Sequence, residues 1–166
     1  MSYTHTNIVL FLLACCSLGI LLAACGDTDD SHSSPTAADL TTIPQRIVVA
    51  GESLMLETYI WRDFMPITPP GGRPMIAAIS IKTVSASDFP AGVDADSMWV
   101  FNNGEVWATV FTDEDRPSDP HVLSKVARDG PLWEPGKSVD VVVRVKNSDG
   151  ERWLLKAASQ TIHRTD

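Results

Sequence analysis

The chain is poor in cysteine and in positive charge. Its three cysteines, Cys15, Cys16 and Cys25, all lie near the start, so the rest of the chain holds no disulfide, thiolate nucleophile or cysteine-ligated metal. Lysine and arginine total 13 against 21 acidic residues, a formal net charge of −8 at pH 7. Nucleic-acid binding needs a surplus of basic side chains on one face, so we expect no nucleic-acid partner. A length of 166 residues excludes a large multidomain enzyme.

Catalytic and metal-binding motifs are missing as well. His121 and His163 are the only histidines after residue 44, and no spacing resembles a zinc or EF-hand signature. We therefore expect a non-enzymatic protein without a cofactor or a bound metal. The acidic loop 113–119 has several carboxylates that could hold Ca²⁺, with a solvated loop as the alternative, and the sequence leaves this choice open.

One strongly apolar segment stands at the start of the chain. Ile8 to Ala24 is a run of 17 residues without a charge, and it leads into Leu22-Ala23-Ala24-Cys25. These last four residues resemble the lipobox of bacterial lipoprotein precursors. The resemblance implies that residues 1–24 are a signal peptide that is removed and that Cys25 is lipidated. The alternative is an uncleaved signal anchor with an incidental cysteine at its end.

The lipobox resemblance also carries an expectation about location. Acyl chains on Cys25 would bury themselves in a bilayer, so we expect a lipid-anchored protein of the cell envelope. Gly26 follows the cysteine, and by resemblance to enterobacterial lipoproteins this favours the outer membrane over the inner one. The periplasmic and surface faces both stay open. Residues 25–44 contain four aspartates, no basic residue and few large apolar ones, which predicts a disordered acidic tether.

Residues 45–166 have the pattern of a single β-domain. Val139, Val141, Val143 and Val145 alternate with other residues, the period of a half-buried strand, and the turn-forming Asn147–Gly150 precedes another strand at 152–156. A second hairpin is indicated by Asn102-Asn103-Gly104 between the apolar runs 98–101 and 105–111. Further strands are expected at 46–50, 54–61 and 75–84, and residues 159–163 extend the last one.

These runs predict an all-β fold. Our first choice is an antiparallel immunoglobulin-like β-sandwich of about seven strands, and a small β-barrel is the alternative. We expect at most one short helix, at Pro120–Arg128, with Asp119 as its N-cap and Pro120 at its first position.

Two aromatic segments are candidates for binding. The connection from Trp61 to Pro74 contains four prolines and the apolar residues Phe64, Met65 and Ile67, so it is expected to be stiff and extended. If exposed, it presents an apolar surface to a partner; otherwise these side chains fold back and cap the domain. Protein binding or envelope assembly is accordingly the function that we expect.

Trp107 and Trp133 support an alternative function. On the second hairpin Val106, Ala108 and Val110 share one face, and we expect Trp107 on the opposite, wetter face, where it could stack on a sugar. Trp133 lies in a loop rich in Pro and Gly, and sealing a corner of the fold is its other interpretation. The alternative function is therefore a carbohydrate or peptidoglycan binding module.

Overall fold

Eight β-strands make up most of the described chain. The computed structural model describes residues 34–111 and 119–166, and within these ranges it contains no α-helix. The strands are β1 (Arg46–Val49), β2 (Glu52–Asp63), β3 (Met75–Thr83), β4 (Asp94–Asn102), β5 (Glu105–Val110), β6 (Val122–Gly130), β7 (Ser138–Lys146) and β8 (Arg152–Thr165). One 3-10 helix, η1 (Asp39–Thr41), precedes them. The all-β prediction is confirmed.

Local sequence patterns explain the strands and hairpins. Along β3, buried side chains strictly alternate with half-buried ones, as the period of two requires. Asn103 and Gly104 adopt φ angles of 46° and 92°, so both take the left-handed conformations of a tight two-residue turn between β4 and β5. The two predicted hairpins, β4–β5 and β7–β8, are confirmed by this pairing.

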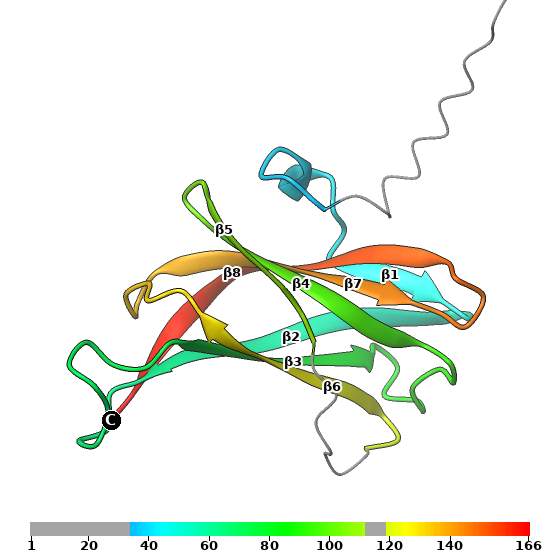
Figure 1. The fold of residues 1–166 in the computed structure, drawn as a ribbon. Coiled ribbons are helices and arrows are strands. Elements are labelled where there is room, and N and C mark those ends of the chain that lie inside the picture. The colour runs from blue at the N-terminus through cyan, green and yellow to red at the C-terminus, as the bar shows by residue number, and fades with distance from the viewer. Residues whose placement is uncertain (1–33, 112–118) are drawn as a thin grey trace, which may run out of the picture.

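All strands belong to one continuous sheet (Figure 1). Its order is β5-β4-β7-β8-β2-β3-β6, and β1 pairs with the first part of β2. The pairing is antiparallel except that Ile60–Asp63 of β2 run parallel to Ile162–Thr165 of β8. The sheet is therefore mixed, whereas a purely antiparallel arrangement was expected.

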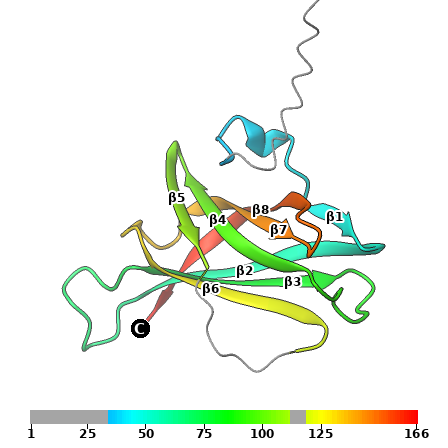
Figure 2. The ribbon, with the colours of Figure 1, turned by 45° about the vertical axis from the view of Figure 1, so that its right-hand side comes forward.

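The long strand β8 makes this arrangement possible. Its first part pairs with β7 and its last part with β2. The β7–β8 register shifts between Val139 and Val141, and Ser159 opposite this point has a φ of 56°. Such an irregularity bends a strand and increases its twist. The sheet curls as a result (Figure 2). The hydrophobic core lies on its inner face.

Side chains close the gap between the two ends of the curled sheet. Trp107 of β5 lies against Gly130 of β6, where a Cβ atom would come within 2.9 Å of the indole ring. Lys125 Nζ of β6 lies 2.9 Å from Asp94 Oδ1 of β4. The immunoglobulin-like sandwich is not confirmed, and one curled sheet closed on itself by side chains fits the alternative of a small barrel.

The short helix predicted at Pro120–Arg128 is wrong, because these residues lead into and form most of β6. Asp119 does not cap a helix. Its carboxylate accepts a hydrogen bond from the His121 backbone N–H (2.9 Å) in the turn before the strand. Pairing with β3, for example of Val126 with Ala78, outweighs the local helix signals, as tertiary contacts commonly do.

Residues 34–44, which the sequence assigned to the tether, pack on the outer face of the sheet in the structure. We call them the N-terminal strap. Ile43 is buried there against Trp99, Phe101 and Val142. Lys156 ties the strap to β8, since its backbone N–H donates to the Pro44 carbonyl (2.9 Å) and its ammonium group to the Leu40 carbonyl.

Candidate functional site

Arg62 organises one end of the molecule. It lies on β2 two residues after Ile60, on the core-facing side of the strand, and only 1% of its surface is exposed. A buried guanidinium needs acceptors for its N–H groups. Arg62 finds backbone carbonyls: Nε donates to Arg73 (3.0 Å), Nη1 to Leu132 (3.1 Å) and Trp133 (3.3 Å), and Nη2 to Gly71.

These hydrogen bonds fasten two loops to the end of the sheet. The β2–β3 loop (64–74) supplies two of the carbonyls and the β6–β7 loop (131–137) supplies the other two. Further hydrogen bonds shape the first loop: Met65 N–H donates to Asp63 Oδ1 (2.9 Å) and Thr68 N–H to the Met65 carbonyl (2.8 Å). Both loops are thereby fixed side by side.

Phe64 forms the packed part of the first loop. Two guanidinium groups lie over its ring, with the Arg62 carbon 4.9 Å and the Arg164 carbon 4.1 Å from the ring centre. Gly72 leaves room for the ring, since a Cβ there would lie 2.8 Å from a ring atom. The Arg164 guanidinium, which is charged at any physiological pH, donates to Asp166 Oδ1 (2.7 Å), and this hydrogen bond raises the pKa of Arg164 further.

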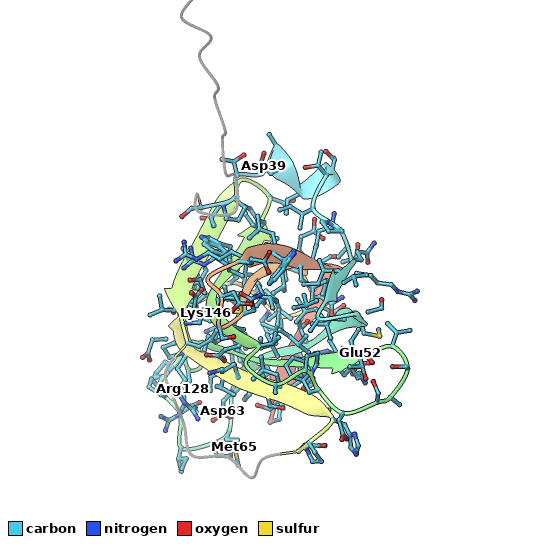
Figure 3. All side chains as sticks on the ribbon, turned by 90° about the vertical axis from the view of Figure 1, so that its right-hand side faces the viewer. Asp39, Glu52, Asp63, Met65, Arg128 and Lys146 are labelled. Carbon is cyan, nitrogen blue, oxygen red and sulfur yellow. The ribbon has the colours of Figure 1, made fainter. Side chains whose placement is uncertain are left out.

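Three apolar side chains of these loops point outward. Met65 is 48% exposed, Ile67 86% and Leu132 60%. We call these three residues the apolar end. The sequence left open whether Phe64, Met65 and Ile67 fold back or face a partner, and the structure divides them: Phe64 folds back, and the other two face solvent. Figure 3 shows Met65 far from Asp39 of the N-terminal strap.

Trp107 does not lie where the sequence placed it. It is 8% exposed and belongs to the core, while Val106 and Val110 of the same strand face solvent. The predicted assignment of the two faces of β5 is wrong. Strand alternation defines two faces but not which one turns inward, and the large indole ring is needed inside to reach Gly130.

The other two candidate tryptophans are half-buried. Trp133 packs against the core beside the carbonyl that Arg62 binds, which agrees with the corner-sealing interpretation. Trp61 lies on the outer face of β2 in a cluster with Tyr59 and His163. The Tyr59 ring centre is 5.3 Å from that of Trp61 and 4.8 Å from that of His163. The Tyr59 ring stacks on that of His163, at an interplanar angle of 18°, and is tilted by 33° against that of Trp61, so part of each ring is in contact with a neighbour.

A second polar cluster lies on the outer face of β4 and β7. Arg144 Nε donates to Asp96 Oδ1 (2.7 Å), and Arg144 Nη2 donates to Ser97 Oγ (2.8 Å). Burial is the largest influence on Asp96 and opposes its ionisation. The hydrogen bonds from Arg144 and Ser97, together with the charges of Arg144 and Lys146, outweigh it and hold the pKa of Asp96 below its ordinary value of 3.8. An open groove of about 500 Å³ adjoins this cluster.

Sequence reasoning found part of the apolar end and missed the rest. It selected Met65 and Ile67 from their stiff, proline-rich context. It missed Leu132, whose carbonyl is bound at the same end by Arg62, 70 residues earlier in sequence. It also missed Arg62, whose position could have been found: Leu54, Leu56 and Ile60 define the inward face of β2, and Arg62 continues that face.

Several expectations fall outside the described residues. Cys25 and the acidic loop 113–118 are not covered, and of the predicted calcium loop only Asp119 is described. Residues 34–111 and 119–166 contain no group of three or more potential metal-ligating side chains. Within the same ranges, no helix has the length and apolar character needed to cross a membrane. Comparisons with known protein families, curated proteins and solved structures find no match to this chain.

Proposed function

We propose that this chain is a lipid-anchored, non-enzymatic protein of the cell envelope that binds a partner protein through the apolar end. Cys25 carries the lipid, and the β-domain carries the binding surface. The outer membrane is the proposed location, on the resemblance of Cys25-Gly26 to enterobacterial lipoproteins. The observation that supports the binding role most directly is the exposure of Met65, Ile67 and Leu132 on loops fastened by one buried arginine.

Fixed loops make the apolar end suited to binding. Ordering a flexible loop on association costs conformational entropy, and this cost is small where hydrogen bonds already hold the loop. Arg62 supplies such bonds to both loops at once. Three exposed apolar side chains on two adjoining loops also offer apolar area to a partner, and exposed apolar patches commonly mark protein-binding surfaces. Rigidity and exposure together favour a protein partner.

The position of the apolar end agrees with attachment through the N-terminus. The N-terminal strap is the part of the described chain closest in sequence to Cys25, and it lies on the opposite side of the molecule from Met65 (Figure 3). A lipid anchor at Cys25 would then leave Met65, Ile67 and Leu132 accessible to a partner. The burial of Trp107 removes one of the two tryptophans on which a carbohydrate module was based.

Anchoring is tested by metabolic labelling with a fatty-acid analogue in a bacterium that processes lipoproteins. The full-length chain is expected to become labelled and to sediment with membranes, and Cys25→Ala is expected to lose the label. Cys15→Ala is the matched control, because that residue leaves with the signal peptide and its replacement should not change labelling. A label that persists in Cys25→Ala would overturn the proposed lipidation.

Partner binding is tested by placing a photo-crosslinking amino acid at Ile67 in the anchored chain. We expect crosslinking to one specific protein. The yield of this product should fall when Leu132 is replaced by Ser, since Leu132 lies on the neighbouring loop. The control position is Val48 on β1, which is also largely exposed, at 66%. Equal crosslinking from Val48, or no effect of Leu132→Ser, would contradict a binding role of the apolar end.

A further inference from the structure

Strand β5 is an edge strand of the curled sheet: its Trp107 side chain reaches Gly130 of β6, but in the described part of the chain β5 has no backbone pairing with β6. It is the last strand in the strand order and pairs with β4. The two-residue turn closes between Asn102 and Glu105, so Glu105, Trp107 and Thr109 exchange backbone hydrogen bonds with β4. The alternating residues Val106, Ala108 and Val110 therefore direct their N–H and C=O groups away from β4. These groups form a row that another strand could pair with.

The sequence of β5 does little to prevent such pairing. Edge strands are usually protected by charged side chains, proline, bulges or a cover. β5 has one charge, Glu105 at its first position, and its register with β4 is regular. The strand at the opposite end of the sheet differs, because β6 carries Lys125, Arg128 and Asp129. Protection is thus uneven between the two edges of the same sheet.

The side chains on the outer face of β5 read the same in both directions. Their order along the strand is Val106, Ala108, Val110, with a valine on each side of the alanine. Val106 is 46% exposed and Val110 is 68% exposed. An antiparallel strand with the same sequence would place Val106 against Val110 of the second copy and Ala108 against itself. Glu105 would then face Phe111 of the second copy, so no like charges meet. A strand that matches its own reverse suits a two-fold symmetric contact.

We propose that β5 pairs antiparallel with β5 of a second copy of this chain, around a two-fold axis at Ala108. The contact joins two curled sheets into one and covers Val106 and Val110 of both copies. A single pair of short strands buries little area, so the contact is weak in dilute solution. Confinement of both copies to one membrane surface raises their effective concentration, a step that rests on the proposed lipid anchor. The pairing itself does not depend on the proposed partner at the apolar end.

Cysteine crosslinking in the full-length, membrane-attached chain tests this register. We expect Ala108→Cys to form disulfide-linked or bismaleimide-linked dimers several-fold more than Val48→Cys, a position on β1 that is also exposed. Two differently tagged copies, one with Val106→Cys and one with Val110→Cys, should crosslink to each other. Two Val106→Cys copies should crosslink poorly, because the antiparallel register holds these residues about 13 Å apart. The parent chain, with its own cysteines, gives the background.

A charge on the edge provides the second arm of the test. Val110→Lys in the Ala108→Cys chain is expected to reduce dimers several-fold, and Val48→Lys is the matched control that should not. The proposal is overturned if Ala108→Cys gives no more dimer than Val48→Cys, or if two Val106→Cys copies crosslink as well as the Val106→Cys and Val110→Cys pair. A different protein crosslinked at Ala108→Cys in place of the second copy would overturn it as well.

Discussion

Arg62 occupies a position where the pattern of β2 calls for an apolar side chain. Burying a charged group is unfavourable unless its hydrogen-bonding capacity is filled. Here the backbone carbonyls of Gly71, Arg73, Leu132 and Trp133 accept four hydrogen bonds, and each of the three guanidinium nitrogens donates at least one. These carbonyls belong to loops outside the sheet ladder. The buried guanidinium therefore gains acceptors, and the loop carbonyls gain a donor. One residue thereby fixes the end of the fold that presents Met65 and Leu132.

Replacing Arg62 by Met is expected to lower the free energy of unfolding by about 3 kcal/mol or more. Methionine keeps a long apolar stem but donates nothing, so several buried carbonyls lose their partners. Urea denaturation of the chain from Ser34 to Asp166 measures the change. Arg46→Met at an exposed site of β1 should change stability by less than about 0.5 kcal/mol. Equal effects at both sites would show that the Arg62 hydrogen bonds contribute little.

Asp96 gives the domain a pH dependence at acid pH. Its pKa is lowered in the folded protein, so the unfolded chain binds its proton at a higher pH than the folded one. The stabilisation is fully present above the unfolded pKa of about 4 and is lost as pH falls through the lower folded value. Asp96→Asn should therefore destabilise the domain at pH 7 and make stability depend less on pH below about 4. A parent and variant that lose stability in parallel over that range would contradict this prediction.

At the scale of elements, local sequence patterns were sufficient to predict the two hairpins but not the structure of the two end strands of the sheet, β5 and β6. The β4–β5 and β7–β8 hairpins follow from turn residues and alternation within about 20 residues of chain. The helix predicted at Pro120–Arg128 failed because β6 is held by β3, more than 40 residues earlier, and no local signal reports that pairing. The prediction of which face of β5 turns inward was wrong for the same reason, because the Trp107 ring packs against Gly130 of β6, a strand later in the sequence.

The contact of β5 with β6 is expected to be sensitive at Gly130. A Cβ there would lie 2.9 Å from the Trp107 ring and 3.0 Å from Met75 Cβ. Gly130→Ala should accordingly cost about 1–3 kcal/mol of stability through overpacking. In a Trp107→Leu background the same substitution should cost less, because part of the conflict is gone. A double-mutant cycle by urea denaturation measures this coupling, and simple additivity would contradict the contact.

At the scale of the whole molecule, the sequence did not predict how the curled sheet closes or which segment covers its outer face. Alternation predicts that each strand has an apolar face, but Trp99, Phe101 and Val142 are apolar residues on the outer face of the sheet. They are covered by the N-terminal strap, whose composition resembles that of a solvated linker. The apolar residues Leu40 and Ile43 were its only sign of packing. Long-range contacts of this kind also decide the candidate site, where Met65 was predicted and Leu132 was not.

The N-terminal strap should therefore behave as part of the domain. A chain that begins at Gln45, the boundary expected from composition, exposes Trp99 and Phe101 to water. Compared with the chain from Ser34, it should unfold at a lower temperature and bind a hydrophobic dye in its folded state. Ile43→Asp should reproduce much of this effect, about 2–4 kcal/mol, by placing a charge in the apolar contact. Gln45→Asp, at an exposed site two residues later, should not. If the shorter chain keeps the stability of the longer one, the strap only rests on the sheet and the domain begins at β1.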